Sequence, residues 1–387
     1  MSEHEGDGRP RPTSPGGAAT SRRPDGWWSS RKKYGVLALA LAVFAIAAVV
    51  VASGSNPSSV AGSGVNVHNL PVGPPPPSLT AAQGWLNSAP LTPTDLHGKV
   101  VLYDFWTYSC VNCVRTIPHL AAFYQRYAPD GLVVIGIHSP EFQFEQDRGN
   151  VTAAVQRLKV AYPVALDPNM AIWNAFGAQY WPEEWVADRT GHLRYMDIGE
   201  GNYTQTEDVL RALLGVPASS PRAPAVGTGS LGAPPATTQN ITNETYLGLE
   251  KGVESAQPGT NTYPDVGPTL PNGAATLVGS WTADQEQVQA AAPGASILLG
   301  YSARSANLVL ATGTGAPIQV QVQLDGHPLP AADRTAETQV DAQGNTYITV
   351  QAPDLYQLVL SPGIEGHTLR LTAESAGLQA FAFTFGA

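Results

Sequence analysis

The only two cysteines of the chain, Cys110 and Cys113, lie two residues apart in the segment YDFWTYSCVNCVRTIP at 103–118. Two thiols at this spacing suit a redox pair, half of a metal site or a structural disulfide. A zinc site of this type needs a second pair of Cys or His ligands, and nothing in the spacing of His119 and His138, the nearest candidates, pairs them. A disulfide across two residues restricts the unfolded chain very little. The pair therefore favours a redox switch, with an inert disulfide and zinc as the weaker alternatives, and no metal ligand is assigned.

The cysteines fall at the junction of a predicted strand and a predicted helix. Val100–Trp106 is an apolar, β-type run, and Val111–Tyr127 has helical spacing. At a helix N-terminus, free amide groups and the helix dipole stabilise a thiolate, which makes Cys110 the expected nucleophile. Cys113 lies one turn further on the same face and is expected to be more buried. Cys110 would attack a substrate disulfide and Cys113 would resolve the mixed disulfide, which needs no bound cofactor.

The surrounding pattern predicts two domains of different class. Around the cysteines, the predicted order β-α-β-α-β-α-β-β-α indicates a mixed sheet with helices on its faces. Its further elements are strands at 131–139, 183–188 and 192–198 and helices at 145–161, 169–176 and 204–214. After about residue 240, short alternating runs separated by turn residues indicate an antiparallel sandwich or jelly roll, with no helix expected beyond one at 284–291.

Length and charge limit the organisation and the class of partner. A chain of 387 residues suggests two to three domains, and its 39 Gly and 33 Pro are typical of loose connectors between them. The formal net charge of −10 argues against a nucleic-acid partner. The expected segments are a disordered cytoplasmic tail, a transmembrane anchor, a linker, an α/β domain, a second linker and a β-sandwich, at 1–33, 34–52, 53–78, 79–216, 217–239 and 240–387 respectively.

The longest apolar run, at 34–52, carries no charge, and about 20 apolar residues are enough to cross a bilayer. Five basic residues precede it and should stay in the cytoplasm: Arg22, Arg23, Arg31, Lys32 and Lys33. A signal peptide cut after Ala52 is the alternative, but the long head and the length of the run favour a single uncleaved transmembrane helix. Either way, the residues from 53 onward are expected on the extracytoplasmic side of the cell membrane, where disulfides persist.

The residues around the cysteines resemble the thioredoxin-fold family. Asp104, Trp106, the pair Cys110 and Cys113, and Pro118 match the thioredoxin signature position by position. The resemblance implies that Asp104 is the buried carboxylate that assists proton transfer at the resolving thiol, and that burial raises its pKa. It also implies that Trp106 packs beside the site, within reach of substrate, and that Pro118 kinks the active-site helix.

A second segment, QYWPEEWVAD at 179–188, looks like the family's cis-proline strand. The resemblance implies a cis peptide bond before Pro182, which only a proline readily allows. It also implies that the backbone at Trp181 faces the cysteines and binds substrate in an extended form. His138 and Glu141 follow the preceding strand and could line the rim of the site or only order their loop.

Within this family, the chain resembles the extracytoplasmic DipZ-type and TlpA/ResA-type proteins. The likeness is strong over 79–216 and weaker after NETYLGLE at 243–250, which opens a sandwich like the one in DipZ-type proteins. Val111-Asn112 stands between the cysteines where many thioredoxins have Gly-Pro, so the resemblance does not carry a reduction potential with it. Thr116 stands where TlpA/ResA-type proteins often carry Glu, which weakens an assignment to cytochrome c maturation.

These observations predict a membrane-anchored thiol–disulfide oxidoreductase that reduces or exchanges disulfides in exported proteins. DipZ-type chains begin with a polytopic electron-transporting domain and this chain shows one apolar span, so a separate membrane electron donor of the CcdA/DsbD type is expected. The competing interpretation is a surface protein with a redox-silent thioredoxin scaffold, whose sandwich binds a glycan or another protein. Four aromatic residues of the sandwich could stack on sugar rings, although such residues are more often core: Trp281, Tyr301, Tyr347 and Tyr356.

Overall fold

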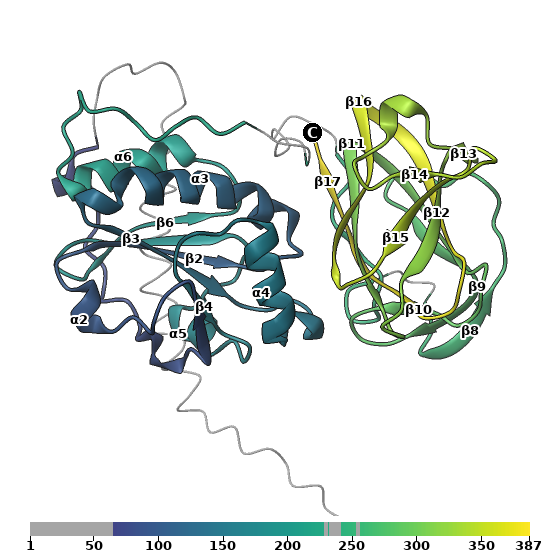
Figure 1. The fold of residues 1–387 in the computed structure, drawn as a ribbon, viewed down its shortest axis with the longest axis horizontal. Coiled ribbons are helices and arrows are strands. Elements are labelled where there is room, and N and C mark those ends of the chain that lie inside the picture. Colours follow the sequence, from purple (N-terminus) through teal and green to yellow (C-terminus); the bar gives the residue numbers. More distant parts are fainter. Residues whose placement is uncertain (1–64, 228–230, 232–240, 253–255) are drawn as a thin grey trace, which may run out of the picture. The chain divides into compact units, whose positions relative to one another are not determined.

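The structure is a computed structural model that describes residues 65–227, 231, 241–252 and 256–387 (Figure 1). All of these residues belong to one compact unit, Gly54–Ala387. The expected cytoplasmic tail at 1–33 and anchor at 34–52 lie outside the described residues. No helix within the described ranges combines the length and the apolar character needed to cross a membrane.

The first domain is built on a six-stranded sheet in the order β1-β4-β3-β2-β5-β6. The strands are β1 Gly84–Leu86, β2 Val100–Trp106, β3 Leu132–His138, β4 Val164–Leu166, β5 Glu183–Ala187 and β6 Leu193–Ile198. Strands β2, β3 and β4 are parallel, whereas β1, β5 and β6 run antiparallel to their neighbours. The central strand β2 is buried at every position, which explains why all its residues except Asp104 are apolar or aromatic. The mixed α/β sheet that the sequence predicts is therefore confirmed.

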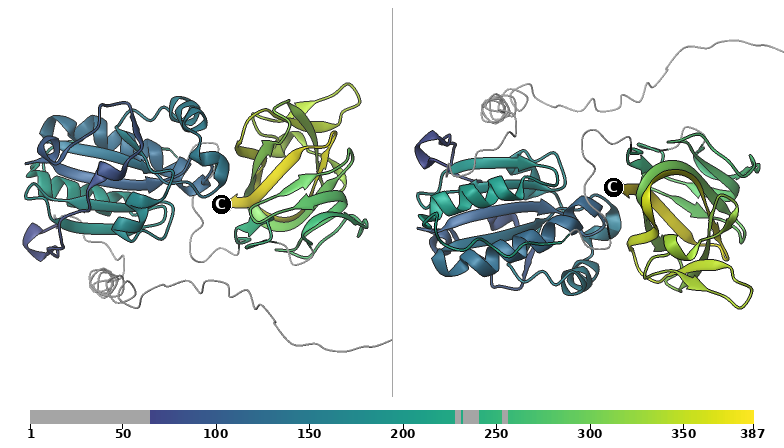
Figure 2. Two further views of the ribbon diagram at one scale, coloured as in Figure 1. Left: turned by 90° about the horizontal axis from the view of Figure 1, so that it is seen from below. Right: turned by 90° about the horizontal axis from the view of Figure 1, so that it is seen from above.

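Helices cover both faces of this sheet. The helices are α2 Pro93–Leu96, α3 Val111–Tyr127, α4 Arg148–Arg157, α5 Ala171–Phe176 and α6 Tyr203–Leu214, with 3-10 turns η1 Val67–Asn69, η2 Leu79–Ala81, η3 Ala128–Asp130 and η4 Gln143–Gln146. Helices α3 and α6 run along the same face, as the views from the side and from above show (Figures 1 and 2). The predicted helix at 145–161 is instead the turn η4 followed by α4, because the side chain of Asp147 caps α4 by accepting the Asn150 N–H.

Alternation along β2 decides which side chains lie under α3 and which lie under α5. Leu102 and Trp106 belong to the core shared with α3 and α6. Phe105 faces the other way, with its ring 5.7 Å from the Trp173 ring of α5. Since side chains alternate between faces of a strand, Asp104 lies on the face covered by α3, the helix that begins with the cysteines.

The second domain is an antiparallel β-sheet domain, in agreement with the class that the sequence predicts. Its strands are β7 Thr245–Tyr246, β8 Gly259–Tyr263, β9 Ala275–Ala283, β10 Val288–Ala290, β11 Ser296–Thr312, β12 Ile318–Leu324, β13 His327–Pro328, β14 Gln339–Val340, β15 Thr346–Val350, β16 Asp354–Ala373 and β17 Leu378–Gly386. The main path of the sheet is β14-β15-β12-β16-β11-β17-β10-β9-β8. A short 3-10 turn, η5 Ala331–Asp333, lies between β13 and β14.

One expectation for this domain is wrong, and one alternative is settled in favour of the core. The segment at 284–291 is a turn followed by β10, because pairing with β9 and β17 buries Val288 and Ala290 there. Trp281 and Tyr301 are 0% and 1% exposed, so they are core residues and no platform for a sugar ring. Of the four aromatic residues considered for stacking, Tyr356 is also buried and Tyr347 is half-buried.

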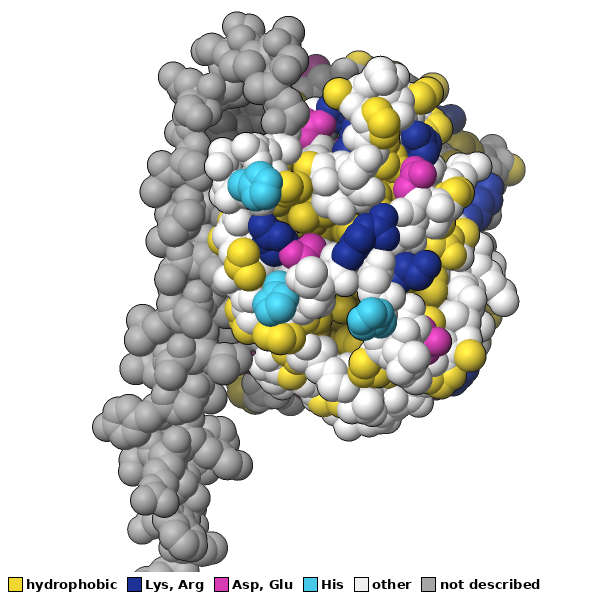
Figure 3. Space-filling model, turned by 90° about the vertical axis from the view of Figure 1, so that its left-hand side faces the viewer, with side chains coloured by type: hydrophobic (Ala, Val, Ile, Leu, Met, Phe, Trp, Pro, Cys, Tyr) yellow, Lys and Arg dark blue, Asp and Glu magenta, His cyan; other side chains and the backbone are white. Residues whose placement is uncertain are grey.

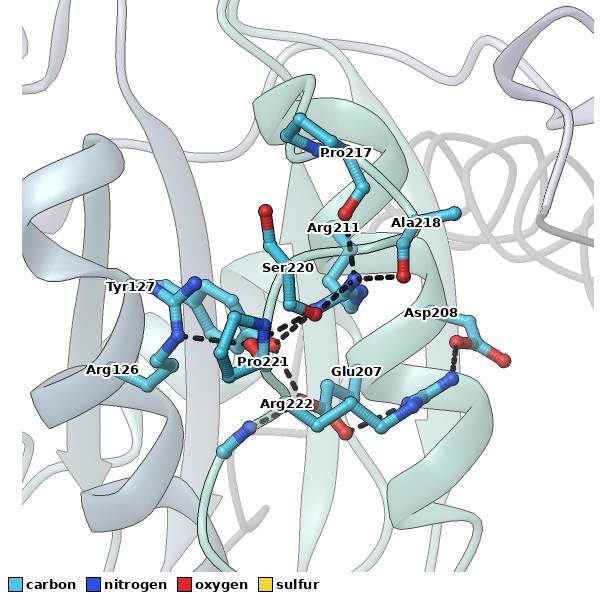
Figure 4. Close-up of polar contacts among 11 residues, drawn as sticks. Arg126, Tyr127, Glu207, Asp208, Arg211, Pro217, Ala218, Ser220, Pro221 and Arg222 are labelled. Atoms are coloured by element: carbon cyan, nitrogen blue, oxygen red, sulfur yellow. Dashed lines mark hydrogen bonds and ion pairs between the residues drawn. The ribbon is translucent and has the colours of Figure 1, made fainter.

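The chain that follows α6 is fastened to the first domain (Figure 4). The guanidinium of Arg211 donates to the carbonyls of residues 217, 218, 220 and 221 and to the Tyr127 hydroxyl. Glu207 accepts from Tyr127, from the Ala223 N–H and from Arg222, which also binds Asp208. The first residues of the expected second linker thus have fixed partners on α3 and α6.

Basic, acidic and hydrophobic side chains are mixed on the face of the molecule drawn in Figure 3. Neither sign of charge forms a continuous patch over the described residues visible in that view. This part of the surface lacks the basic stripe that nucleic-acid binding needs.

Candidate active site

The two cysteines occupy different environments at the start of α3. Cys110 is the N-cap residue of the helix, and its Sγ accepts the Cys113 N–H at 3.3 Å. Both residues are free thiols; Cys110 is partly exposed, whereas Cys113 is only 1% exposed. Cys113 is therefore the more buried of the two cysteines, as the sequence predicts.

A buried carboxyl group lies near the resolving thiol. Asp104 is 1% exposed, and its Oδ1 has no hydrogen-bond partner. Burial raises the pKa of Asp104 to about 8. Burial also raises the pKa of Cys113, and the nearby Cys110 and Asp104 raise it further. An acid that titrates close to neutral pH can both take and return the Cys113 proton, which is the role that the thioredoxin resemblance implies for it.

Trp181 and Pro182 close the site opposite the cysteines. The Trp181–Pro182 peptide bond is cis, as the resemblance implies. The Cys110 thiol donates to the Trp181 carbonyl, with 3.6 Å between the sulfur and the oxygen. The Trp181 ring stacks on Trp173 with centroids 4.2 Å apart and donates from its Nε1 to the Ser139 carbonyl at 2.9 Å. This backbone is held in place next to the reactive sulfur.

Trp106, which was expected within reach of substrate, and His138, for which the rim was one of two alternatives, both lie in the core. Trp106 is fully buried, so it supports the site without touching a substrate. His138 packs edge-on against the Trp106 ring and stacks on Tyr108, and its burial lowers its pKa to about 3. Neutral His138 is therefore a packing residue, because the end of β3 points it inward. Glu141, by contrast, lines the cleft beside Cys110.

Glu145 organises the loop before the nucleophile, and the sequence analysis missed this role. Its Oε1 accepts from the Ser109 hydroxyl at 2.6 Å, and its Oε2 accepts the N–H groups of Glu141 and Phe142 at 2.7 and 2.9 Å. Glu145 is 1% exposed, and burial raises its pKa. The signal in the sequence was weak, because Ser109 and Glu145 are 36 residues apart.

A buried ion pair holds the residue between the cysteines. Arg115 donates from Nε to both carboxylate oxygens of Glu200, at 2.8 and 3.0 Å, and from Nη2 to Asn112 Oδ1 at 2.6 Å. Both charged side chains are nearly buried, at 4% and 5% exposure. The pair fixes the loop before α6 against the first turn of α3.

A cleft of about 670 Å³ opens at the Cys110 sulfur. From the first domain it is lined by Cys110, Val111, Asn112, Glu141, Gln179, Tyr180, Trp181 and Glu200. Within the same compact unit, residues of the second domain also line it: Ile241, Thr242, Asn243, Glu244, Tyr246, Lys251, Thr384 and Phe385. The Tyr246 hydroxyl donates to Glu141 at 2.6 Å. The Cys110 side chain thus lies in a cleft lined by both polar and apolar residues.

Comparison with known proteins agrees with this geometry. The family model described as Redoxin matches residues 71–214, which hold the cysteine pair, the buried Asp104 and the cis-proline. Residues 71–214 therefore form a redoxin (thioredoxin-like) domain. A second family model, described as a thioredoxin-like C-terminal domain, matches residues 242–386.

Three curated proteins show how far the similarity of this chain extends. Protein DipZ of Mycobacterium bovis is 36% identical over 320 residues, which are 80% of this chain and 42% of DipZ. The chain therefore spans less than half the length of DipZ. Thiol-disulfide oxidoreductase YkuV of Bacillus subtilis is 29% identical over 36% of this chain and 94% of its own. Thiol-disulfide oxidoreductase ResA of Bacillus thuringiensis is 27% identical over 31% of this chain and 66% of its own.

Proposed function

We propose that this protein is a thiol–disulfide oxidoreductase that reduces or exchanges disulfides in exported proteins. The observation that carries the proposal is the contrast between a partly exposed Cys110, facing the carbonyl before the cis-proline, and a buried Cys113 beside Asp104. The Cys110 thiolate attacks one sulfur of a substrate disulfide, and the other sulfur leaves as a thiolate. Cys113 then loses its proton and displaces the bound sulfur from Cys110.

The Cys110→Ser variant tests this activity directly. It should abolish reduction of insulin coupled to dithiothreitol, because no other cysteine can open the substrate disulfide. The Cys113→Ser variant should accumulate the mixed disulfide, because the resolving thiol is missing. Turnover by Cys110→Ser at the wild-type rate would refute the assignment.

We also propose that the protein is anchored in the cell membrane by one helix, with the functional domains on the extracytoplasmic side. The apolar run at 34–52 and the basic residues before it support this arrangement. Attachment of a thiol-reactive, membrane-impermeant label to Cys110 in intact cells is the expected result. A label that reaches Cys110 only after lysis would contradict it.

A separate membrane protein of the CcdA/DsbD type is proposed as the electron donor. The two cysteines of this sequence are the redox pair itself, so the electrons that reduce the Cys110–Cys113 disulfide come from another thiol protein. Co-purification of Cys113→Ser with a disulfide-linked membrane protein tests the proposal. In cells that lack such donors, the wild-type cysteine pair should stay oxidised. In cells that contain them, it should be reduced.

A second candidate role belongs to the antiparallel domain, which we propose to be a jelly-roll-like sandwich able to contact a glycan or a protein. A polar pocket of about 790 Å³ supports this role, and Asn243, Asn272 and Lys251 are among its lining residues. If binding were the main function, Cys110 would be unreactive toward iodoacetamide near neutral pH. Rapid alkylation of Cys110 there would favour the oxidoreductase.

A further inference from the structure

Three carboxyl groups form a row across the sheet of the redoxin domain. Asp104 on β2 is registered directly opposite Glu184 on β5, and Glu184 directly opposite Asp197 on β6. Residues in direct register on antiparallel strands share one face of the sheet, with Cβ atoms about 4.5–5.5 Å apart. Helices α3 and α6 cover this face, with Cys113 and Thr206 on its side. The row therefore runs from the resolving thiol at the centre of the sheet to the edge strand β6.

These carboxyl groups have few hydrogen-bond partners for their burial. Asp104 and Glu184 are 1% and 2% exposed, whereas Asp197 is half-buried. One oxygen of each has no hydrogen-bond partner: Asp104 Oδ1, Glu184 Oε2 and Asp197 Oδ2. Thr206 hydrogen-bonds to Glu184, and at the exposed end of the row Asn202 donates to Asp197 Oδ1 at 2.9 Å. An ionised carboxylate without partners is costly to bury, so protons reside on the row.

The groups that face the row from each packed element are weak acids. Cys113 faces it from α3, Tyr162 from the turn before β4, Tyr195 from β6, and Tyr203 from α6. Glu200, near Tyr203, is neutralised by Arg115. Burial raises the pKa of Glu184, and its neighbours Asp104 and Asp197 raise it further. Among the described residues no lysine, arginine or histidine forms an ion pair with a member of the row.

Because Cys113 and Asp104 are both buried, neither can exchange a proton with water directly. Each turnover removes the proton of the Cys113 thiol, yet both side chains are about 1% exposed. Resting on the proposed function, we propose that Glu184 and Asp197 carry this proton from Asp104 to solvent at the edge of the sheet. Glu184 and Asp197 are positioning and relay residues in this scheme, because neither touches the reacting sulfurs.

Asp104 gives a proton to Glu184, Glu184 gives one to Asp197, and Asp197 releases one to water. The Asp104 carboxylate then takes the proton of the Cys113 thiol. The Cys113 sulfur bonds to the Cys110 sulfur as the bond between Cys110 and substrate breaks, and the substrate leaves as a thiolate with the electron pair. The substrate disulfide is reduced by two electrons and the cysteine pair is oxidised by two. Reduction of the pair by a donor thiol runs the proton in the opposite direction.

Single-turnover kinetics of Glu184→Gln and Asp197→Asn test the relay in the full chain. The rate of formation of the mixed disulfide, measured in a Cys113→Ser background, should not change in either variant. With Cys113 present, Glu184→Gln should slow resolution of the mixed disulfide by about tenfold at pH 7, a fraction of what general acid–base catalysis usually supplies. Asp197→Asn should slow it less, and a concentrated small buffer should restore its rate because the gap lies at the exposed end of the row. Asp208→Asn, a carboxyl on the outer side of α6, is the matched control and should behave as wild type.

The outcomes separate the relay from the function on which it rests. If the wild type resolves the mixed disulfide and both variants match its rate and pH profile, the relay is refuted and the oxidoreductase stands. If the wild type forms no mixed disulfide, the proposed function fails and the relay fails with it. Should Glu184→Gln not fold, the half-buried Asp197→Asn decides the question, since loss of its rate and recovery by buffer are specific to a proton path.

Discussion

Replacing Asp104 with Asn should stabilise the protein at neutral pH while it slows resolution of the mixed disulfide. The pKa of Asp104 is raised from 3.8 to about 8 by burial. Between these values the folded state holds a proton that the unfolded state has released. The free energy of unfolding therefore falls as pH rises through this window. Each pH unit is worth about 1.36 kcal/mol, so at pH 7 this penalty reaches about 4 kcal/mol, and Asn removes it.

Denaturant unfolding of the wild type and of Asp104→Asn, at about pH 4 and at pH 7, measures this effect. The variant should gain up to about 4 kcal/mol at pH 7 and less than about 1 kcal/mol near pH 4, where the carboxyl of the unfolded chain is only about half ionised. Asp208→Asn serves as the control, because the Asp208 carboxyl lies near the surface and pairs with Arg222. A gain of equal size at both pH values would refute the reasoning, because it would show that packing and not ionisation causes it.

Three further variants test the supports of the site. Arg115→Met should lower the free energy of unfolding by about 3 kcal/mol, because it leaves Glu200 buried without its partner. The double variant Arg115→Met with Glu200→Gln should recover much of this loss. Equal losses for the single and the double variant, measured by urea unfolding, would contradict the reasoning. Glu145→Ala should lower the free energy of unfolding by about 3 kcal/mol or more and slow insulin reduction, because one hydroxyl and two backbone N–H groups lose their acceptor. Ser109→Ala, which removes only one of these bonds, should lower the free energy of unfolding by about 1 kcal/mol. Arg211→Met should speed proteolysis within 217–223, because the carbonyls of that segment lose their donor. The control Arg304→Met, which frees a carbonyl in the second domain, should leave this cleavage unchanged. If Arg211→Met is cleaved at the wild-type rate, other contacts hold the segment.

Sequence patterns predicted elements best where one physical cause dominated. Val100–Trp106 and Val111–Tyr127 are the strand and the helix that were expected, because one is buried on both sides and the other is strongly amphipathic. The short strand Gly84–Leu86 was missed, because its three residues are held only by pairing with β4. The helix expected at 284–291 gave way to a strand, because two long-range partners decide its conformation.

For the site, the sequence by itself determined the reactive group and its order of action. The reactivity of Cys110 at the helix N-terminus and the position of Cys113 one turn later follow from the local sequence alone. The tertiary structure alone decided which other groups act with them. Trp106 and His138 were turned into the core, Glu145 was brought to Ser109, and three strands far apart in the chain placed carboxyl groups side by side. Such contacts depend on the register between strands, which spacing along one chain does not encode.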